Sequence, residues 1–216
     1  MNKEWSELNK TLQTQIKKKD SYSDGIDTLI ELRDQIMTTV NSFRNDLTRD
    51  DFDALPYINA DGYHSKNIAY SLWHIFRIED IVAHELIQGD EEIFFAKDYQ
   101  KRTHSPIITT GNELVKEQIS DFTKQLDIDE LYSYISDVKA VTESMLKALP
   151  YADLKNRITE DRKERLSKAG VVSSDESAIW LIDYWCGKDI KGLIQMPFSR
   201  HWIMHTEACL RIKNKL

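Results

Sequence analysis

The chain is poor in the residues that build tight turns and covalent cross-links. Only 7 Gly and 4 Pro occur among 216 residues. A β-sandwich or barrel needs many turns, which draw on these two residues, so their scarcity favours long helices. The only cysteines, Cys186 and Cys209, form no Cys-x-x-Cys pair. We therefore expect small core thiols in a reducing compartment rather than a disulfide framework.

The chain also lacks an excess of basic charge and long apolar runs. Its formal net charge of -7 argues against a general affinity for nucleic acid or for anionic membranes. No uncharged apolar run approaches the length of a membrane span, and residues 1–7 lack the apolar stretch of a signal peptide. We expect a cytoplasmic protein with no membrane partner and no nucleic-acid partner.

The size and composition suit one domain with a substantial core. Hydrophobic residues make up 41% of the chain, which is enough to bury such a core. No internal repeat, low-complexity tract or linker divides the sequence. We therefore expect a single domain over residues 1–216, opened by an amphipathic lead-in helix within residues 1–20.

Apolar residues recur at spacings of three and four in several long segments, which is the pattern of a helix with one buried face. We expect Ser65 to cap the second long helix and Gly89 to end it, Pro150 to stop the third, and Pro197 to open the last. Loops are expected at 48–62 and 91–112, and shorter helices at 113–126 and 154–169. The four long helices are predicted at residues 26–47, 65–89, 129–149 and 197–212.

Three histidines in two of these helices suggest a metal site. His201 and His205 are four residues apart, so both imidazoles leave one helix face a turn apart, as two ligands of one divalent metal would. Trp202 stands where the zinc-protease signature has its Glu, which excludes that class. His74 is the third candidate, because facing helices of a bundle build metal sites in the core. Three imidazoles leave a position open for water or a thiolate, whose pKa the metal lowers.

Other titratable residues fall outside this set. His84 follows His74 by ten residues, about 80° around a helix, so it should miss the same site. Glu79 points off the face of His74 and is assigned neither as ligand nor as base. A di-metal carboxylate bundle would need Glu-x-x-His repeats, which neither Glu79 nor Glu207 forms with any histidine.

Several residues have structural explanations as well as functional ones. Each of the three histidines, taken alone, is also typical of a hydrogen-bonded core side chain. Cys209 continues the four-residue step after His205, but a small core thiol is the expected role. Trp180, Tyr184 and Trp185 either fill the core or line a substrate pocket.

Two segments give the chain a family resemblance: residues 71–79 (SLWHIFRIE) and residues 200–205 (RHWIMH). With these, and with the order of elements between them, residues 26–212 resemble the DinB/YfiT-like family of metal-binding four-helix-bundle proteins. The resemblance implies an all-α, up-and-down four-helix bundle with additional short helices. It implies a divalent metal, zinc or nickel foremost, on His74, His201 and His205, with water completing the shell.

The resemblance also implies an activity. Relatives transfer low-molecular-weight thiols such as bacillithiol or catalyse thiol-dependent isomerisation, and hydrolysis has also been associated with the family. We therefore expect a metal-dependent thiol transferase or hydrolase acting on a small molecule, with a low-molecular-weight thiol as cosubstrate and a homodimer as the assembly. No further catalytic residue is assigned.

Two departures from the family pattern point to a divergent branch. Many relatives follow the second histidine of the pair with an Arg-Gly-Gln-like run, whereas residues 206–208 here read Thr-Glu-Ala. The segments 91–127 and 175–196 are also longer than a minimal bundle needs. These departures leave the reaction open, and the alternative is a non-catalytic metal-binding or stress-response module.

Overall fold

The computed structural model describes residues 2–216, and its regular elements are all helical. Within this range the only β-type pairing is an isolated bridge between Arg157 and Asp189. The prediction of an all-α protein is therefore confirmed. None of the helices in the described range combines the length and the apolarity needed to cross a bilayer.

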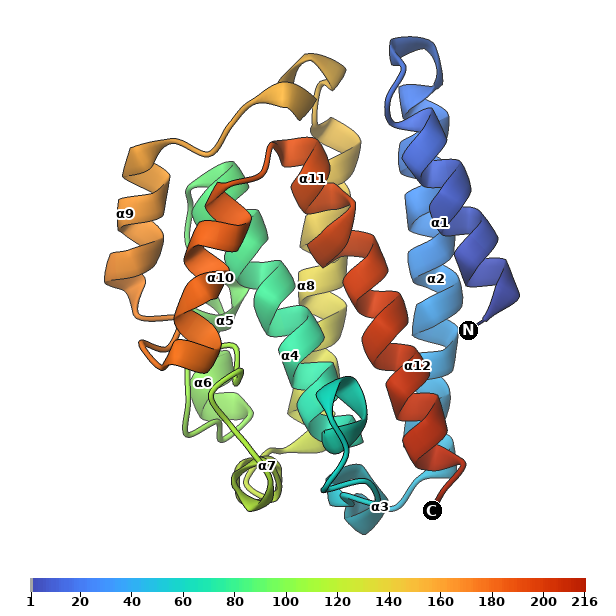
Figure 1. Ribbon diagram of the computed structural model, residues 1–216, viewed down its shortest axis with the longest axis vertical. Helices are drawn as coiled ribbons and strands as arrows, with labels where there is room; N and C mark the ends of the chain where they lie inside the picture. The colour runs from blue at the N-terminus through green and yellow to red at the C-terminus, as the bar shows by residue number, and fades with distance from the viewer. Residues whose placement is uncertain (1) are drawn as a thin grey trace.

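Four long helical segments run lengthwise through the molecule, and α1 (Lys3–Gln15) packs along one of them, α2 (Figure 1). The four segments are α2 (Tyr22–Asp46), α4 (Ile68–Ile81) with η3 (Val82–Gln88), α8 (Ile128–Ala148), and η5 (Met196–Arg200) with α12 (His201–Lys213). Two of the four include a π-helical turn. The turn η3 continues α4, and the turn η5 precedes α12.

The direction of these helices differs from the expected up-and-down order. In Figure 1, α2 and α12 run one way and α4 and α8 run the other way, so α4 and α8, which are consecutive long helices, are parallel. Two consecutive helices that are parallel need a connecting segment that runs back along the full length of the bundle. Residues 89–127 form that crossover, which explains why this segment is longer than a simple loop.

Short helices occupy the connections, including both segments predicted as loops. The helix α3 begins with a capping box, in which the Thr48 hydroxyl accepts from the Asp51 amide and the Asp51 carboxylate accepts from the Thr48 amide. These short helices include the two predicted within residues 113–126 and 154–169, which are confirmed. The others were not predicted, because most of them are too short to show an apolar periodicity. The short helices are α3 (Arg49–Asp53), η2 (Gly62–Ser65), α5 (Ile93–Ala96), α6 (Tyr99–Arg102), α7 (Glu117–Thr123), η4 (Tyr151–Lys155), α9 (Glu160–Ala169), α10 (Glu176–Cys186) and α11 (Ile190–Ile194).

The first long helix begins earlier than predicted, at Tyr22 rather than at residue 26. Gly25 therefore lies in its first turn instead of in a break between helices. A Cβ atom at Gly25 would lie 3.1 Å from the backbone nitrogen of Ile16. The glycine thus allows the end of α1 to approach α2 closely.

The start of the second long helix also differs from the prediction, whereas its end agrees. Asn67 is the N-cap, and its side chain accepts a hydrogen bond from the amide of Tyr70, so Ser65 does not cap the helix. Gly89 ends η3 with a left-handed backbone conformation, φ 80°, which favours glycine. The helix predicted over 129–149 is confirmed as α8.

A buried ion pair joins the long helices. Arg33 on α2 donates hydrogen bonds of 2.9 and 2.7 Å to the Glu79 carboxylate on α4, and both side chains are fully buried. The Trp202 indole on α12 donates to the same carboxylate at 2.7 Å. Arg33 also donates to Glu143 on α8 at 3.1 Å and to the Phe198 carbonyl on η5 at 3.2 Å. This network holds all four helical segments, and it confirms that Glu79 lies outside the histidine set.

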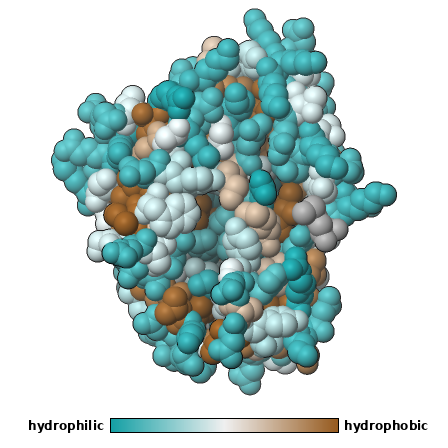
Figure 2. Space-filling view, viewed as in Figure 1, coloured by the Kyte–Doolittle hydropathy of each residue, from teal (hydrophilic) through white to brown (hydrophobic). Residues whose placement is uncertain are grey.

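The two cysteines are free thiols. Cys209 is fully buried, and burial raises the pKa of its thiol to about 12, whereas Cys186 is half-buried. The expectation of a core thiol is confirmed for Cys209. On the face shown in Figure 2, hydrophilic residues cover most of the surface and hydrophobic residues appear as separate small areas.

Replacing Arg33 by Met should lower the free energy of unfolding by about 3–5 kcal/mol, because Glu79 would remain buried without its counter-charge. Urea denaturation followed by circular dichroism measures this loss. As a control, Lys168→Ala breaks a pair with Glu164 whose side chains are 74% and 64% exposed. That change should alter stability by less than about 0.5 kcal/mol. A similarly small loss for Arg33→Met would refute the assigned role of the network.

Candidate metal centre

The structure brings the three predicted histidines together. His74 comes from α4, and His201 and His205 from α12, and each is at most 6% exposed. One ring nitrogen from each lies within 4.8 Å of the others, a spacing at which they could hold one ion. Within residues 2–216, no other group of three or more His, Cys, Asp or Glu side chains gathers in this way.

His74 is oriented by a partner from the crossover segment. Its Nδ1 atom lies 2.7 Å from the Thr110 carbonyl oxygen. A carbonyl only accepts, so Nδ1 carries the proton and Nε2 is left with its lone pair. The Tyr70 ring stacks on the imidazole with centroids 5.4 Å apart. Partners of this kind fix the tautomer and the ring orientation of metal-ligating histidines.

The other two imidazoles have buried nitrogens without hydrogen-bond partners. These are Nδ1 of His201 and both ring nitrogens of His205, judged over the described residues. An unsatisfied buried polar atom costs about 1–3 kcal/mol, and native structures seldom contain one. A divalent cation bound by imidazole nitrogens would use such lone pairs, and zinc and nickel accept these ligands readily. The residues present therefore fit a metal.

Burial keeps all three imidazoles neutral. Loss of hydration lowers the pKa of His74 to about 4, the Thr110 hydrogen bond opposing this shift only in part. Burial, followed by the neighbouring imidazoles, lowers the pKa of His201 and His205 well below the usual value. Only the neutral imidazole ligates, so at neutral pH a metal would have no proton to displace.

A π-helical turn positions the start of α12. The His201 amide bonds to the Met196 carbonyl, five residues earlier, instead of the usual four. Pro197 lies inside this turn and has no N–H to donate, which disfavours a regular α-helix at this point. π-Turns of this kind frequently occur at functional sites. Both Met196 and Pro197 line the cavity described next.

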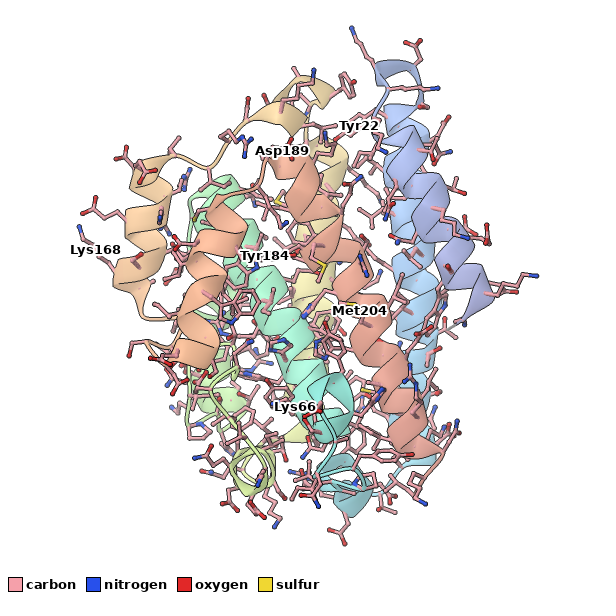
Figure 3. All side chains as sticks on the ribbon, viewed as in Figure 1. Tyr22, Lys66, Lys168, Tyr184, Asp189 and Met204 are labelled. Carbon is pink, nitrogen blue, oxygen red and sulfur yellow. The ribbon has the colours of Figure 1, made fainter. Side chains whose placement is uncertain are left out.

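A cavity of about 280 Å³ opens over the three histidines. Trp180, Tyr184 and Trp185 of α10 line it, so the aromatic segment forms a pocket wall, while Trp185 is also part of the core. Figure 3 places Tyr184 on the side of α10 that is turned toward α12. Tyr63 of η2 completes this aromatic wall, with its ring centroid 4.7 Å from that of His205.

Sequence reasoning missed three residues of the site, namely Tyr63, Thr110 and Asn112. Thr110 and Asn112 lie in the segment predicted as a loop at 91–112, and Tyr63 directly follows the loop predicted at 48–62. In these connections no periodic pattern marks a side chain as buried or directed inward. Their roles depend on contacts with helices distant in sequence. No signal in the sequence alone identified them.

His84 and Cys209, which were predicted to lie outside the metal site, are confirmed to lie outside the group of three histidines. His84 bonds through Nδ1 to the Asp90 carboxylate at 2.6 Å and does not join the group of three. Cys209 lies in the hydrophobic core, where its thiol interacts with Ser71, and it is not part of that group either.

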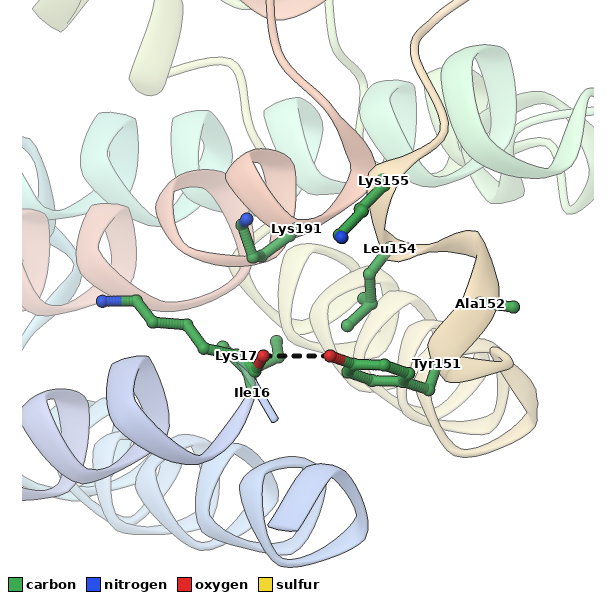
Figure 4. Close-up of a pocket in the computed structure, with 7 residues that line it drawn as sticks. All are labelled: Ile16, Lys17, Tyr151, Ala152, Leu154, Lys155 and Lys191. Atoms are coloured by element: carbon green, nitrogen blue, oxygen red, sulfur yellow. Dashed lines mark hydrogen bonds between the residues drawn. The ribbon is translucent and has the colours of Figure 1, made fainter. Parts of the chain in front are cut away.

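A second hollow, of about 200 Å³, lies between the end of α1 and the segment around η4 (Figure 4). Its lining includes three lysines, Lys17, Lys155 and Lys191, and the Tyr151 hydroxyl donates to the Lys17 carbonyl at 2.9 Å. The lining residues include no imidazole, thiol or carboxylate. Among the described pockets, the cavity over the histidines is therefore the candidate metal centre.

Acidification should destabilise the metal-free protein. His74 takes up a proton near pH 6.5 when unfolded but only near pH 4 when folded. Its contribution to stability is therefore present above pH 6.5 and is lost as the pH falls toward 4. The loss for His74 alone is about 2 kcal/mol between pH 7 and pH 5. Urea denaturation of chelator-treated protein at the two pH values measures it.

His74→Asn isolates this contribution, because an Asn amide can still donate to the Thr110 carbonyl but does not titrate. The variant should lose about 2 kcal/mol less than the wild type on acidification. The matched control is His104→Asn, at an exposed position whose φ of 58° suits Asn. It should show the wild-type loss. If His74→Asn also shows the full loss, the buried neutral state of His74 is not its source.

No protein-family model matches the chain, and no curated protein matches it in sequence. The structure itself establishes a helical chain in which His74, His201 and His205 form a buried cluster able to hold a metal.

Proposed function

We propose that this chain is a divalent-metal-dependent enzyme of the DinB/YfiT-like type, with His74, His201 and His205 as the ligands and a small molecule as substrate. One observation carries the proposal: three buried neutral imidazoles, with unpaired nitrogens, form the wall of a cavity. The metal would be zinc or nickel, since both favour imidazole.

The residues of the site would each have a defined role. When bound, the metal supplies a Lewis acid that lowers the pKa of a water or thiol at its open position. His74 offers Nε2 because Thr110 holds its Nδ1 proton. The ligand set contains no carboxylate, so it would leave the positive charge of the ion uncompensated. No carboxylate lines the cavity either, and no separate general base is assigned.

The number of ligands favours catalysis over a structural metal. Structural zinc sites are closed by four protein ligands, whereas catalytic sites use three and keep one position for water or substrate. Here the described chain supplies three, and the nearby thiol of Cys209 is turned into the core. Hydrolysis needs only water at the open position. Thiol transfer would need a low-molecular-weight thiol, and support for it comes from the family resemblance alone.

Each of His74→Ala, His201→Ala and His205→Ala should abolish stoichiometric metal binding, because two imidazoles leave too few ligands. Elemental analysis of untagged protein after reconstitution measures the metal-to-protein ratio. The control His104→Asn, outside the site, should retain the wild-type content, near one equivalent. Full metal content in all three alanine variants would rule out this site.

Removing the metal should leave the helices folded, because the core and the Arg33–Glu79 pair do not depend on it. Metal at a thousandfold excess over its Kd should stabilise the protein by about 4 kcal/mol. Circular dichroism and thermal unfolding, with and without chelator, measure both effects. Loss of helical structure on chelation would instead support the alternative, a non-catalytic module braced by its metal.

A further inference from the structure

The cavity over the histidines has no charged wall. Apart from the imidazoles and Asn112, its lining is aromatic or aliphatic. Lys66 approaches the site but lies outside the lining, where its ammonium donates to the Leu114 carbonyl at 2.9 Å and sits over the Tyr70 ring. A charged group entering the cavity would lose hydration and find no counter-ion among these walls. Without a metal, the walls themselves therefore favour an uncharged ligand.

Two exposed rings of α10 stand at this cavity in fixed orientations. Trp180 and Tyr184, one turn apart, are 48% and 37% exposed, and their ring centroids are 5.5 Å apart in an edge-to-face arrangement. The Trp180 indole donates to the Ser177 carbonyl at 2.8 Å, and the Lys188 ammonium lies 4.1 Å from the Tyr184 centroid. Preoriented aromatic walls bind planar apolar groups by stacking and burial.

Asn112 lines the cavity and carries an amide donor. Its Oδ1 accepts from the Thr110 hydroxyl at 2.9 Å, and its Nδ2 makes no hydrogen bond within the described chain. The loop that carries it is held in place, because the Gly111 carbonyl accepts from the Tyr70 hydroxyl at 2.9 Å. A ligand with a carbonyl-type acceptor would pair with Nδ2.

The volume limits the size of the ligand. The cavity measures about 280 Å³. A dry protein cavity of about 150 Å³ holds one benzene ring, and drug-sized ligands occupy about 300–1,000 Å³. The space therefore suits a compound of one or two fused rings.

We propose that the cavity binds an uncharged, planar aromatic compound carrying a carbonyl-type acceptor, with its ring against Trp180 and its acceptor on Asn112. As the identity of a substrate, this inference rests on the proposed function. As a statement about ligand binding, the inference depends only on the cavity. The proposed ligand class and the proposed metal-dependent function can therefore be refuted separately.

β-Naphthamide and β-naphthoate test the charge preference, because they share a ring system and differ in charge. Each would be titrated by calorimetry into the full chain, as purified and again after removal of metal by chelator. The metal-free protein should bind the amide at least tenfold more tightly than the carboxylate. Equal or tighter binding of the carboxylate to the metal-free protein would overturn the proposal.

Substitutions test the assigned contacts. Trp180→Ala should weaken amide binding at least tenfold, because it removes the ring assigned to stack on the ligand, and Asn112→Ala should weaken it about three- to tenfold. Ile179 is the matched control: it neighbours Trp180 on α10, is 42% exposed, and does not line the cavity. Ile179→Ala should leave the affinity within twofold of the wild type.

Two results would contradict the assignment of Trp180. One is an equal loss of affinity in Ile179→Ala. The other is a change of oligomeric state in Trp180→Ala, measured by sedimentation velocity, which would assign the ring to an interface between copies of the chain. Chelator-treated wild-type protein separates the two proposals, because it lacks metal and should still bind the amide. A wild-type chain that binds the amide but no metal would refute only the proposed function.

Discussion

The buried pair between Arg33 and Glu79 constrains the arrangement of the helices that carry the metal candidates. Neither side chain contacts solvent, so the two charges are tolerated only together. Glu79 follows His74 on α4, and Trp202, which donates to Glu79, follows His201 directly on α12. A slip of α12 by one turn would move Trp202 about 5.4 Å and break this hydrogen bond. The position of the ion pair thus determines which side chains of α4 and α12 meet.

The three histidines form a site in which the fold leaves buried ring nitrogens without hydrogen-bond partners. His201 and His205 keep unpaired buried nitrogens, although the same core supplies Glu79 with several donors. Stability alone would favour apolar side chains at these positions. Three unpaired nitrogens gathered on two neighbouring imidazoles beside a cavity are what a site prepared for a ligand would show.

The crossover between α4 and α8 contributes to the site as well as to the connection. Thr110 holds His74 through its carbonyl, Gly111 accepts from Tyr70, and Asn112 lines the cavity. Because these three residues are consecutive, the orientation of the imidazole and the placement of the cavity donor depend on one short stretch of chain. The buried ion pairs Arg33–Glu79 and Arg77–Glu92 lie outside the cavity lining, which carries no charged side chain, so the charge of a bound metal would dominate the pocket.

The sequence by itself determined the helical class, the three helix ends at Gly89, Pro150 and Pro197, and the shared face of His201 and His205. Each of these depends on local backbone geometry, since a spacing of four residues places two side chains together on any α-helix. Only the tertiary structure decided that His74 joins them, that α4 and α8 are parallel, and that Tyr63, Thr110 and Asn112 border the site. Those outcomes depend on contacts between distant segments, such as Arg33 with Glu79, and helical periodicity carries no information about which helix faces which.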